Sequence, residues 1–319
     1  MRIALIIVNY RTAELCAGCL DSLASEITGN GSWHVEILDG ASGDRSVDQL
    51  REHIDRRGYG SWCALTALDR NGGFAFANNC SIRRTLTAVD ASEFYLLLNP
   101  DTVVRPGAIQ ALVKFLTTHP RVGIVGSCLE DPDGTPQTSA FNFPCVLGEF
   151  GNSARIGPLT WLLRPWQTAP PPRGEAHRCD WVAGACMLVR REVFEQIGLL
   201  DEGYFMYYEE VDFCLRAARA GWECWYLPDA RVVHLVGQSS GVTDLRVPLR
   251  RLPAYWFESR RRYFEKNHGG GYRVTADMAW TLGQILYLGY RRLRGKPDLD
   301  PPFLIRDFLS HSVAKKTAL

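Results

Sequence analysis

The sequence IALIIV at residues 3–8, followed at once by the polar tripeptide Asn9-Tyr10-Arg11, decides the fold. A strand with one solvent-exposed face alternates apolar and polar residues. An unbroken apolar run therefore predicts a strand that is buried on both faces. Further strand-like runs cover 35–38, 63–68 and 94–98, and helical patterns cover 12–23, 44–54 (with Ser42 as its N-cap) and 74–89. This alternation predicts an α/β fold: a mostly parallel central sheet with helices on both faces.

Composition and length set the outer limits of the fold. The 319 residues are 46% hydrophobic and 22% charged, an ordinary globular composition that excludes a disordered chain, a collagen-like fibre and a small disulfide scaffold. Helical patterns with a glycine-rich break at 269–271 follow the α/β region. We therefore expect one large domain at 1–240 and a helical extension at 241–319.

Charge is distributed unevenly along the chain. The net charge of +1 gives no indication of a nucleic-acid partner, but residues 241–319 hold 15 Lys and Arg against 7 Asp and Glu. A basic helical end with Trp256, Trp280 and Tyr287 suits docking on a membrane face. An ordinary helical cap on the domain, with a solvated basic surface, explains the same residues equally well.

Cysteine usage and the N-terminus bear on location. The ten cysteines have no regular spacing, and the C-x-x-C of Cys16 and Cys19 has no second pair of ligands at zinc spacing nearby. Buried free thiols, and hence a reducing, cytoplasmic location, are the expectation. The apolar run at 3–8 is too short for a signal peptide, and no stretch reaches the roughly 18 apolar residues of a membrane-spanning helix. Residues 130–178 are expected to form an irregular surface excursion.

The ends of the first four predicted strands are polar in a regular way. Each is followed by asparagine or aspartate: Asn9, Asp39, Asp69 with Asn71, and Asn99 with Asp101. The carboxyl ends of parallel strands meet at one edge of a sheet, which is where such sheets bind ligands. Turns are polar in any case, and this explains each strand end singly, but less well all four together.

Two acidic segments are candidates for chemistry. Asn99 and Asp101 are two apart in an extended segment, so both can present oxygens to one Mg²⁺ or Mn²⁺ ion; an Asx-turn is the alternative. Glu209, Glu210 and Asp212 open a predicted helix, whose apolar stripe is Val211, Cys214, Leu215 and Ala218. Aromatic residues precede these carboxylates and can raise their pKa values for acid–base work, whereas stabilisation by the helix dipole is the alternative. A lone histidine, His234, carries no role by itself.

Seven ordered blocks within about residues 3–240 resemble family 2 glycosyltransferases of the GT-A fold, and specifically their rhamnosyltransferase-like branch. The blocks are IIVNYR (6–11), DGASGDRS (39–46), NGGFA (71–75) with NN (78–79), LNPD (98–101), GACM (184–187), FMYYEEVD (205–212), and His234 with Gly237 and Ser239. Any one block is a weak signal, but seven in order are a strong one. Three positions depart from the family pattern, with Gly40 in place of Asn, Asn99 in place of Asp, and Glu210 in place of Asp.

The resemblance implies a role for each matching residue. Asp39 would bind the nucleobase of a sugar nucleotide, and Asn71 and Asn79 would lie near the nucleotide or the chain that shapes its site. Asp101 would bind a divalent ion, Mg²⁺ or Mn²⁺, on the diphosphate, and Glu210 would be the catalytic base, with Asp212 in reserve. The remaining implied site residues are Val8, Asn9 and Tyr10 at the nucleotide, Asn99 and His234 at the metal, Gly184 and Ala185 near the donor sugar, and Glu209 beside the base.

The implied reaction is an inverting displacement in which an acceptor hydroxyl attacks the anomeric carbon and a nucleoside diphosphate leaves. The branch resemblance favours dTDP-rhamnose among dTDP- and UDP-sugars, with a glycan or polyprenyl-diphosphate-linked glycan as the acceptor. Two rivals remain. A nucleotidyltransferase needs a glycine-rich phosphate loop after the first strand, which Asn9-Tyr10-Arg11-Thr12 lacks. A catalytically inactive relative that binds glycan or nucleotide is the other.

Overall fold

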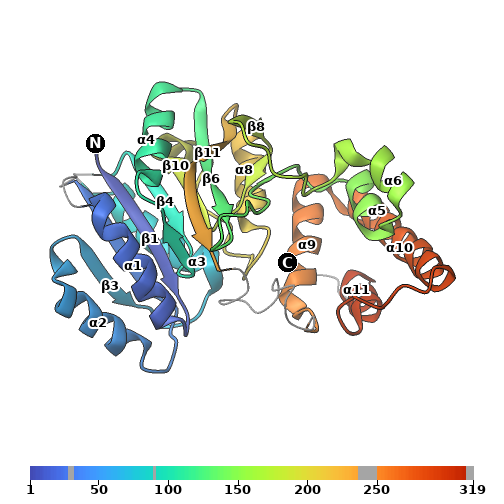
Figure 1. The fold of residues 1–319 in the computed structure, drawn as a ribbon, viewed down its shortest axis with the longest axis horizontal. Coiled ribbons are helices and arrows are strands. Elements are labelled where there is room, and N and C mark those ends of the chain that lie inside the picture. Colours follow the sequence, from blue (N-terminus) through green and yellow to red (C-terminus); the bar gives the residue numbers. More distant parts are fainter. Residues whose placement is uncertain (28–31, 89–90, 236–249, 314–319) are drawn as a thin grey trace. The chain divides into compact units, whose positions relative to one another are not determined.

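The computed structural model describes residues 1–27, 32–88, 91–235 and 250–313, and the chain forms two compact units (Figure 1). The first unit consists of Met1–Phe141, Pro171–Phe205 and Glu209–Ser240. The second consists of Asn142–Pro170, Met206–Tyr208 and Gly241–Leu319. The expected boundary at 240/241, and the motif residues Gly237 and Ser239, lie outside the described residues.

A nine-stranded sheet forms the centre of the first unit, counted over the described residues. Its strands are β1 (Ile3–Asn9), β2 (Trp33–Asp39), β3 (Cys63–Ala67), β4 (Phe94–Leu98), β5 (Thr102–Val104), β6 (Val122–Glu130), β8 (His177–Cys179), β10 (Cys186–Arg190) and β11 (Glu223–His234). Their order is β3-β2-β1-β4-β10-β6-β11-β5, with β8 on β11. β10, β5 and β8 run antiparallel to their neighbours and the other pairs are parallel, which confirms the predicted mostly parallel sheet.

Helices cover both faces of this sheet, as predicted. The helices of the first unit are α1 (Ala13–Ile27), α2 (Ser46–Arg57), α3 (Gly73–Leu86), α4 (Ala108–Thr118), α7 (Arg191–Ile197) and α8 (Glu209–Arg219). Strand residues Leu5 and Leu96 join a core cluster with apolar residues of α1, α2 and α4. On the opposite face Tyr95 meets Phe194 of α7, which in turn meets Phe213 of α8. Right-handed crossovers explain why the helices divide between the two faces. The chain moves in one direction along the sheet from β1 to β3, and it moves in the opposite direction when it returns through α3 to β4.

Two sequence expectations about local structure are wrong, and one strand was not predicted. Ser42 does not cap α2, which begins at Ser46 with Arg45 as its N-cap residue and no side-chain cap. Residues 130–178 are not irregular throughout, because α5 (Val146–Ala154) and α6 (Gly157–Leu162) form there. The sequence pattern gave no sign of β5, a three-residue strand that pairs with β11. The short strands β7 (Ala140–Phe141) and β9 (Trp181–Val182) pair in a small second sheet.

The second unit is helical, as the sequence predicts for the C-terminal region. It contains α5, α6, α9 (Ala254–His268), α10 (Gly270–Leu293) and α11 (Leu304–Val313). Gly269, with φ of 87°, separates α9 from α10 at the expected glycine-rich break. α10 packs closely on α5 at Gly283, where an added Cβ would lie 2.6 Å from the carbonyl oxygen of Phe150. Only glycine allows this approach of the two helices.

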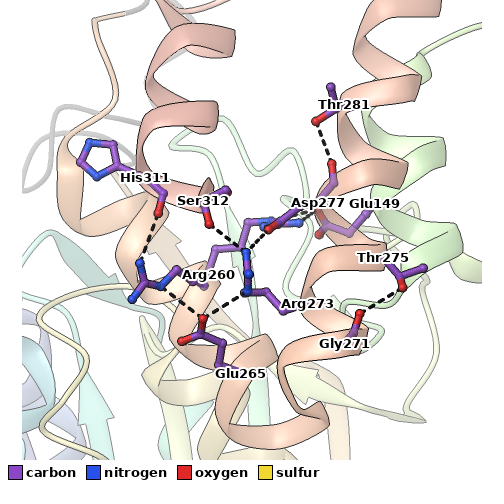
Figure 2. Close-up of polar contacts among 11 residues, drawn as sticks. Glu149, Arg260, Glu265, Gly271, Arg273, Thr275, Asp277, Thr281, His311 and Ser312 are labelled. Carbon is purple, nitrogen blue, oxygen red and sulfur yellow. Dashed lines mark hydrogen bonds and ion pairs between the residues drawn. The ribbon is translucent and has the colours of Figure 1, made fainter. Parts of the chain in front are cut away.

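A buried ion network ties α5, α9 and α10 together (Figure 2). Arg260 is 1% exposed; its Nε and Nη2 donate to Glu149 Oε2 at 2.9 and 2.7 Å, and its Nη1 donates to Asp277 Oδ1 at 2.6 Å. Arg273 also donates from Nη1 to Asp277 Oδ2 and to the carbonyl of Ser312. Burial disfavours the charged form of Arg260, but the negative charges of Glu149 and Asp277 outweigh it and raise the pKa of the guanidinium.

Of the three aromatic residues expected at a membrane face, one lies in the core of the second unit. Trp280 is 8% exposed and stacks on Phe308 at 3.8 Å between ring centroids, so its predicted role in docking is wrong. Trp256 packs partly buried against the same core, and the guanidinium of Arg155 covers the Tyr287 ring at 3.8 Å. No helix among the described residues combines the length and the hydropathy that crossing a bilayer requires.

All ten cysteines are unpaired, as expected. Cys16 and Cys19 are fully buried on α1, and burial raises the pKa of Cys19 to about 12. The C-x-x-C is thus a pair of inert core thiols and not a metal or redox site.

Candidate active site

The ends of β1 and β2 form a polar cradle around Asp39. Asn9 and Asp39 are register partners, and Asn9 Nδ2 donates to Asp39 Oδ2 at 2.7 Å. The Ser42 hydroxyl donates to the same oxygen at 2.7 Å, and the Ser42 amide donates to Oδ1 at 3.0 Å. Asp39 is 1% exposed. Its carboxylate is fixed in orientation from both sides, with Val8 half-buried on the strand before it.

Two further predicted residues lie at this cradle. A Cβ added at Gly40 would lie 3.8 Å from the Tyr10 ring and 3.8 Å from Asn71 Oδ1. Tyr10 is 40% exposed, and the guanidinium of Arg11 lies over its ring at 5.1 Å from the centroid. The structure therefore brings together the ends of β1 and β2 and the loop after β3, as the topology of the sheet predicts.

The pairing of β5 with β11 brings Asp101 and His234 together. Thr102 and His234 are register partners, and the Leu235 amide donates to the Asp101 carbonyl at 2.9 Å. As a result His234 Nε2 lies 3.6 Å from Asp101 Oδ1. Asp101 is 1% exposed, whereas the His234 side chain is 16% exposed.

Asp101 and His234 are suited to bind a hard divalent ion whose remaining ligands come from water and a substrate. Among the described residues no group of three or more His, Cys, Asp or Glu side chains could hold a metal by itself. Mg²⁺ commonly takes one or two protein ligands and fills its shell with water and substrate phosphates, so the pair is the kind of partial site that a diphosphate would close. The half-buried Asn99 is the adjoining candidate ligand.

The turn between β9 and β10 links this edge to α8. The Asn99 amide donates to the Ala185 carbonyl at 2.9 Å. A Cβ added at Gly184 would lie 3.6 Å from the Phe74 ring and 3.8 Å from Glu210 Cβ. Phe74 was not anticipated from the sequence, since one aromatic residue in a helical pattern carries no signal of a site.

Two glutamates open α8, and hydrogen bonds from the backbone of its first turn only partly offset the burial of their carboxyl groups. Glu209 is 4% exposed and Glu210 is half-buried, and an Oε2 atom on each is shielded from solvent and has no hydrogen-bond partner among the described residues. Burial raises the pKa of the Glu210 carboxyl to about 7. Burial also raises the pKa of Glu209 well above its usual range, and the charge of Glu210 adds to the effect. A carboxyl with a pKa near neutrality is suited to accept a proton.

Asp212, the reserve candidate for the base, is anchored instead. Its Oδ2 accepts from Arg216 Nε at 2.9 Å and its Oδ1 accepts from the Tyr204 hydroxyl at 3.3 Å, with the side chain fully buried. Arg216 also donates to the carbonyls of Ile197 and Leu199, at 2.7 Å each. The expected apolar stripe of α8 is wrong at its end, where Ala218 is exposed.

Asn79 holds the chain that leads to α8. Its Nδ2 donates to the Leu200 carbonyl at 2.8 Å and to Glu202 Oε1 at 2.9 Å, and its Oδ1 accepts from the Leu200 amide. Gly73 supports the same segment, because with φ of 85° it lets the Phe74 amide donate to the Phe205 carbonyl at 3.0 Å. A Cβ at Gly73 would lie 1.9 Å from that carbonyl oxygen. Of the two roles considered for Asn79, these contacts favour shaping the site.

Comparison with known proteins now decides the family. The model of the family described as glycosyltransferase like family 2 matches residues 1–251, well over half of the chain. The chain belongs to glycosyltransferase family 2. Within this family it is 34% identical to the N-acetylglucosaminyl-diphospho-decaprenol L-rhamnosyltransferase of Mycobacterium tuberculosis over 234 residues, 71% of this chain and 68% of that protein. It is 24% identical to the dTDP-rhamnosyl transferase RfbF of Shigella flexneri over 208 residues, 64% of each chain.

A solved structure shows a similar fold. The mannosyltransferase PcManGT of Pyrobaculum calidifontis, solved with GDP-Man and Mn²⁺, is similar with a TM-score of 0.59 and 15% identity, covering 98% of this chain and 85% of that one. The likeness shows the GT-A fold. This family 2 protein is thus a nucleotide-sugar glycosyltransferase with rhamnosyltransferase relatives, and nothing in the comparisons supports the inactive alternative.

Proposed function

We propose that this glycosyltransferase moves rhamnose from dTDP-rhamnose to a hydroxyl of a lipid-linked glycan, with inversion at the anomeric carbon. The donor and acceptor follow from its relatives, one named for dTDP-rhamnosyl transfer and one for an N-acetylglucosaminyl-diphospho-decaprenol substrate. The observation that carries the chemistry is Glu210: a shielded, unpaired carboxyl oxygen with a pKa of about 7, beside Gly184 and Phe74.

Donor binding is assigned to the edge of the sheet. Asp39, fixed by Asn9 and Ser42, accepts from the nucleobase, and the exposed Tyr10 ring offers a face against which a planar base stacks. Asn71 and Gly40 line the same cradle. The diphosphate then lies toward Asp101 and His234, on the far side of β1.

The transfer step needs a base and a charged leaving group. Glu210 takes the proton of the acceptor hydroxyl, the freed oxygen pair forms a bond to the anomeric carbon, and the bond from that carbon to the diphosphate oxygen breaks. When bound by Asp101, His234 and Asn99, Mg²⁺ or Mn²⁺ would supply positive charge for the departing diphosphate. Arg216 and Tyr204 hold Asp212, which fixes the first turn of α8 and with it the glutamates.

The assignment of the base is tested with matched variants of the purified protein. Glu210→Gln is expected to lower kcat for rhamnosyl transfer about 10²- to 10⁴-fold, the usual contribution of a general base, while titration calorimetry shows unchanged binding of dTDP. Glu209→Gln is the matched control, because it removes the same group one residue away and should retain most of kcat. Full transfer by Glu210→Gln would exclude this residue as the base.

The donor and the metal are tested by calorimetric titration with dTDP, UDP and GDP, each with Mn²⁺, with Mg²⁺ and with a chelator. We expect tight, metal-dependent binding of dTDP, and loss of the metal dependence in Asp101→Asn. Preference for UDP or GDP would overturn the rhamnose donor while leaving the transferase intact. Binding that is indifferent to metal would remove Asp101 and His234 from the metal site.

A further inference from the structure

The outward face of α10 is apolar along its length, which a surface helix in water does not need. We call this the α10 outer face; it consists of Val274, Met278, Leu282, Ile285, Leu286 and Leu293, all exposed. Met278 is 67% exposed and Leu293 is 88% exposed. At about 100° per residue the six side chains lie within an arc of roughly 120°, opposite the buried Ala276, Trp280 and Gly283. Single exposed apolar residues are ordinary, but a continuous strip of this kind marks an interaction surface.

The unpaired charged side chains next to the α10 outer face are basic. The single acidic residue of α10, Asp277, is buried and bound by Arg260 and Arg273 (Figure 2), so the α10 outer face carries no carboxylate. At the C-terminal end of the helix Arg292, Arg294 and Lys296 are exposed, and the described residues offer none of them a carboxylate partner. The nearby Asp298 is bound by Arg291.

A second segment of the same unit has the same character. Residues 150–170 contain two arginines and no aspartate or glutamate. On α6 and the turn that follows it, Trp161 is 75% exposed, Leu162 is 61% exposed and Trp166 is 42% exposed. Exposed tryptophan and leucine beside arginine are typical of segments that rest at the boundary of headgroups and acyl chains.

We propose that the α10 outer face docks the second unit on an anionic lipid bilayer, with α10 lying in the plane of the surface. The apolar strip enters the acyl boundary, and Arg292, Arg294 and Lys296 meet the acidic headgroups. The charge argues for this occupant over a protein, since a strip without carboxylates, bordered by unpaired basic groups, complements a negatively charged sheet of headgroups. The inference deepens the proposed function, because a lipid-linked acceptor lies at such a surface, but vesicle binding is measured without donor or acceptor.

Flotation of the full chain with lipid vesicles tests the proposal. We expect binding to vesicles of equal parts phosphatidylglycerol and phosphatidylcholine at 0.1 M salt, and at least about tenfold weaker binding to pure phosphatidylcholine or at 0.5 M salt. The triple variant Met278→Glu, Leu282→Glu, Ile285→Glu should lose vesicle binding by at least about tenfold. The control Gln49→Glu, Gln110→Glu, Ala218→Glu adds the same charge at exposed positions of the first unit and should bind as the parent protein does.

Folding and self-association are separated from lipid binding in the same experiment. Binding of dTDP reports on the first unit, and the milder variant Arg292→Gln, Arg294→Gln, Lys296→Gln, which changes only exposed side chains, should lose affinity for anionic vesicles alone. Light scattering gives the mass of each variant. Failure of the parent protein to float, or flotation of the triple glutamate variant equal to it, would overturn the proposal. So would a dimeric parent protein that becomes monomeric in that variant, which would make α10 a contact between copies.

Discussion

The two units of this glycosyltransferase each withdraw a pair of carboxyl groups from water, and they treat them in opposite ways. In the second unit Glu149 and Asp277 share the guanidinium of Arg260, at 2.7 and 2.6 Å. In the first unit Glu209 and Glu210 each keep an oxygen that is shielded and has no partner among the described residues. The former pair is held as ions and ties helices together, whereas the latter is pushed toward the protonated form.

The contrast shows that burial does not by itself distinguish a functional carboxyl from a structural one. A buried ion costs free energy unless a counter-charge and hydrogen bonds satisfy it. Where they do, as at Arg260, the buried ions stabilise the packing of the helices. Where they do so only in part, as at Glu210, burial raises the pKa of the carboxyl to about 7, and the group can exchange a proton near neutral pH.

The largest effect is expected from breaking the compensated pair. Arg260→Ala leaves two buried carboxylates without their counter-charge, and we expect the free energy of unfolding of the second unit to fall by about 3–5 kcal/mol. Urea denaturation followed by tryptophan fluorescence measures it, because Trp280 lies in that unit's core. The exposed Arg306→Ala on α11 is the control and should change stability by no more than about 0.5 kcal/mol. A loss equal to the control would show that the network is not structural.

A smaller loss is expected at Asp212, which shares the helix of the glutamates but resembles the compensated pair. Asp212→Asn removes the charge that Arg216 binds, while Arg216 keeps its two carbonyl acceptors, so we expect a loss of about 2 kcal/mol. Transfer measured well below the unfolding temperature should fall much less than in Glu210→Gln. A large fall of kcat with unchanged stability would instead identify Asp212 as the base.

The pH dependence of transfer sharpens the assignment of Glu210. A general base works in its deprotonated form, so kcat/KM should rise with pH and level off above a midpoint of about 7. At one pH unit below the midpoint the rate should be about a tenth of its plateau. Glu209→Gln should keep this profile. A midpoint near 4.5 would mean that the reacting carboxyl is well solvated and would point away from Glu210.

The smallest effect is a gain of stability. The pKa of Glu209 is raised in the folded state, so folding favours its protonated form, and the stability it costs is absent below pH 4.5 and grows as pH rises toward neutrality. Glu209→Gln should therefore stabilise the first unit by about 1 kcal/mol at pH 8 and by almost nothing at pH 4.5. Thermal unfolding at the two pH values compares them. An equal shift at both would show that the charge of Glu209 is not the cause.

Much of the site was predictable because strand ends of a parallel sheet must meet. Asn9, Asp39 and Asn71 each follow an apolar strand, and the structure places them around Gly40. His234 was different: by itself it carried no signal, and only the family resemblance gave it a role. It lies by Asp101 through β5, a strand of three residues that is too short for any periodicity to show.

The sequence by itself determined the α/β fold, the order of its motifs and the residue types available for chemistry, since apolar periodicity and turn residues are local properties. Tertiary structure decided that Asp212 is ion-paired, whereas Glu209 and Glu210 each keep a shielded oxygen without a hydrogen-bond partner among the described residues. Arg216 and Tyr204 bind Asp212, whereas burial raises the pKa of Glu210, which lies beside Gly184, to about 7. It also decided that Trp280 is buried while Met278, two residues earlier, is exposed. Compensation of charge and burial depend on neighbours brought from distant parts of the chain, and no local pattern encodes them.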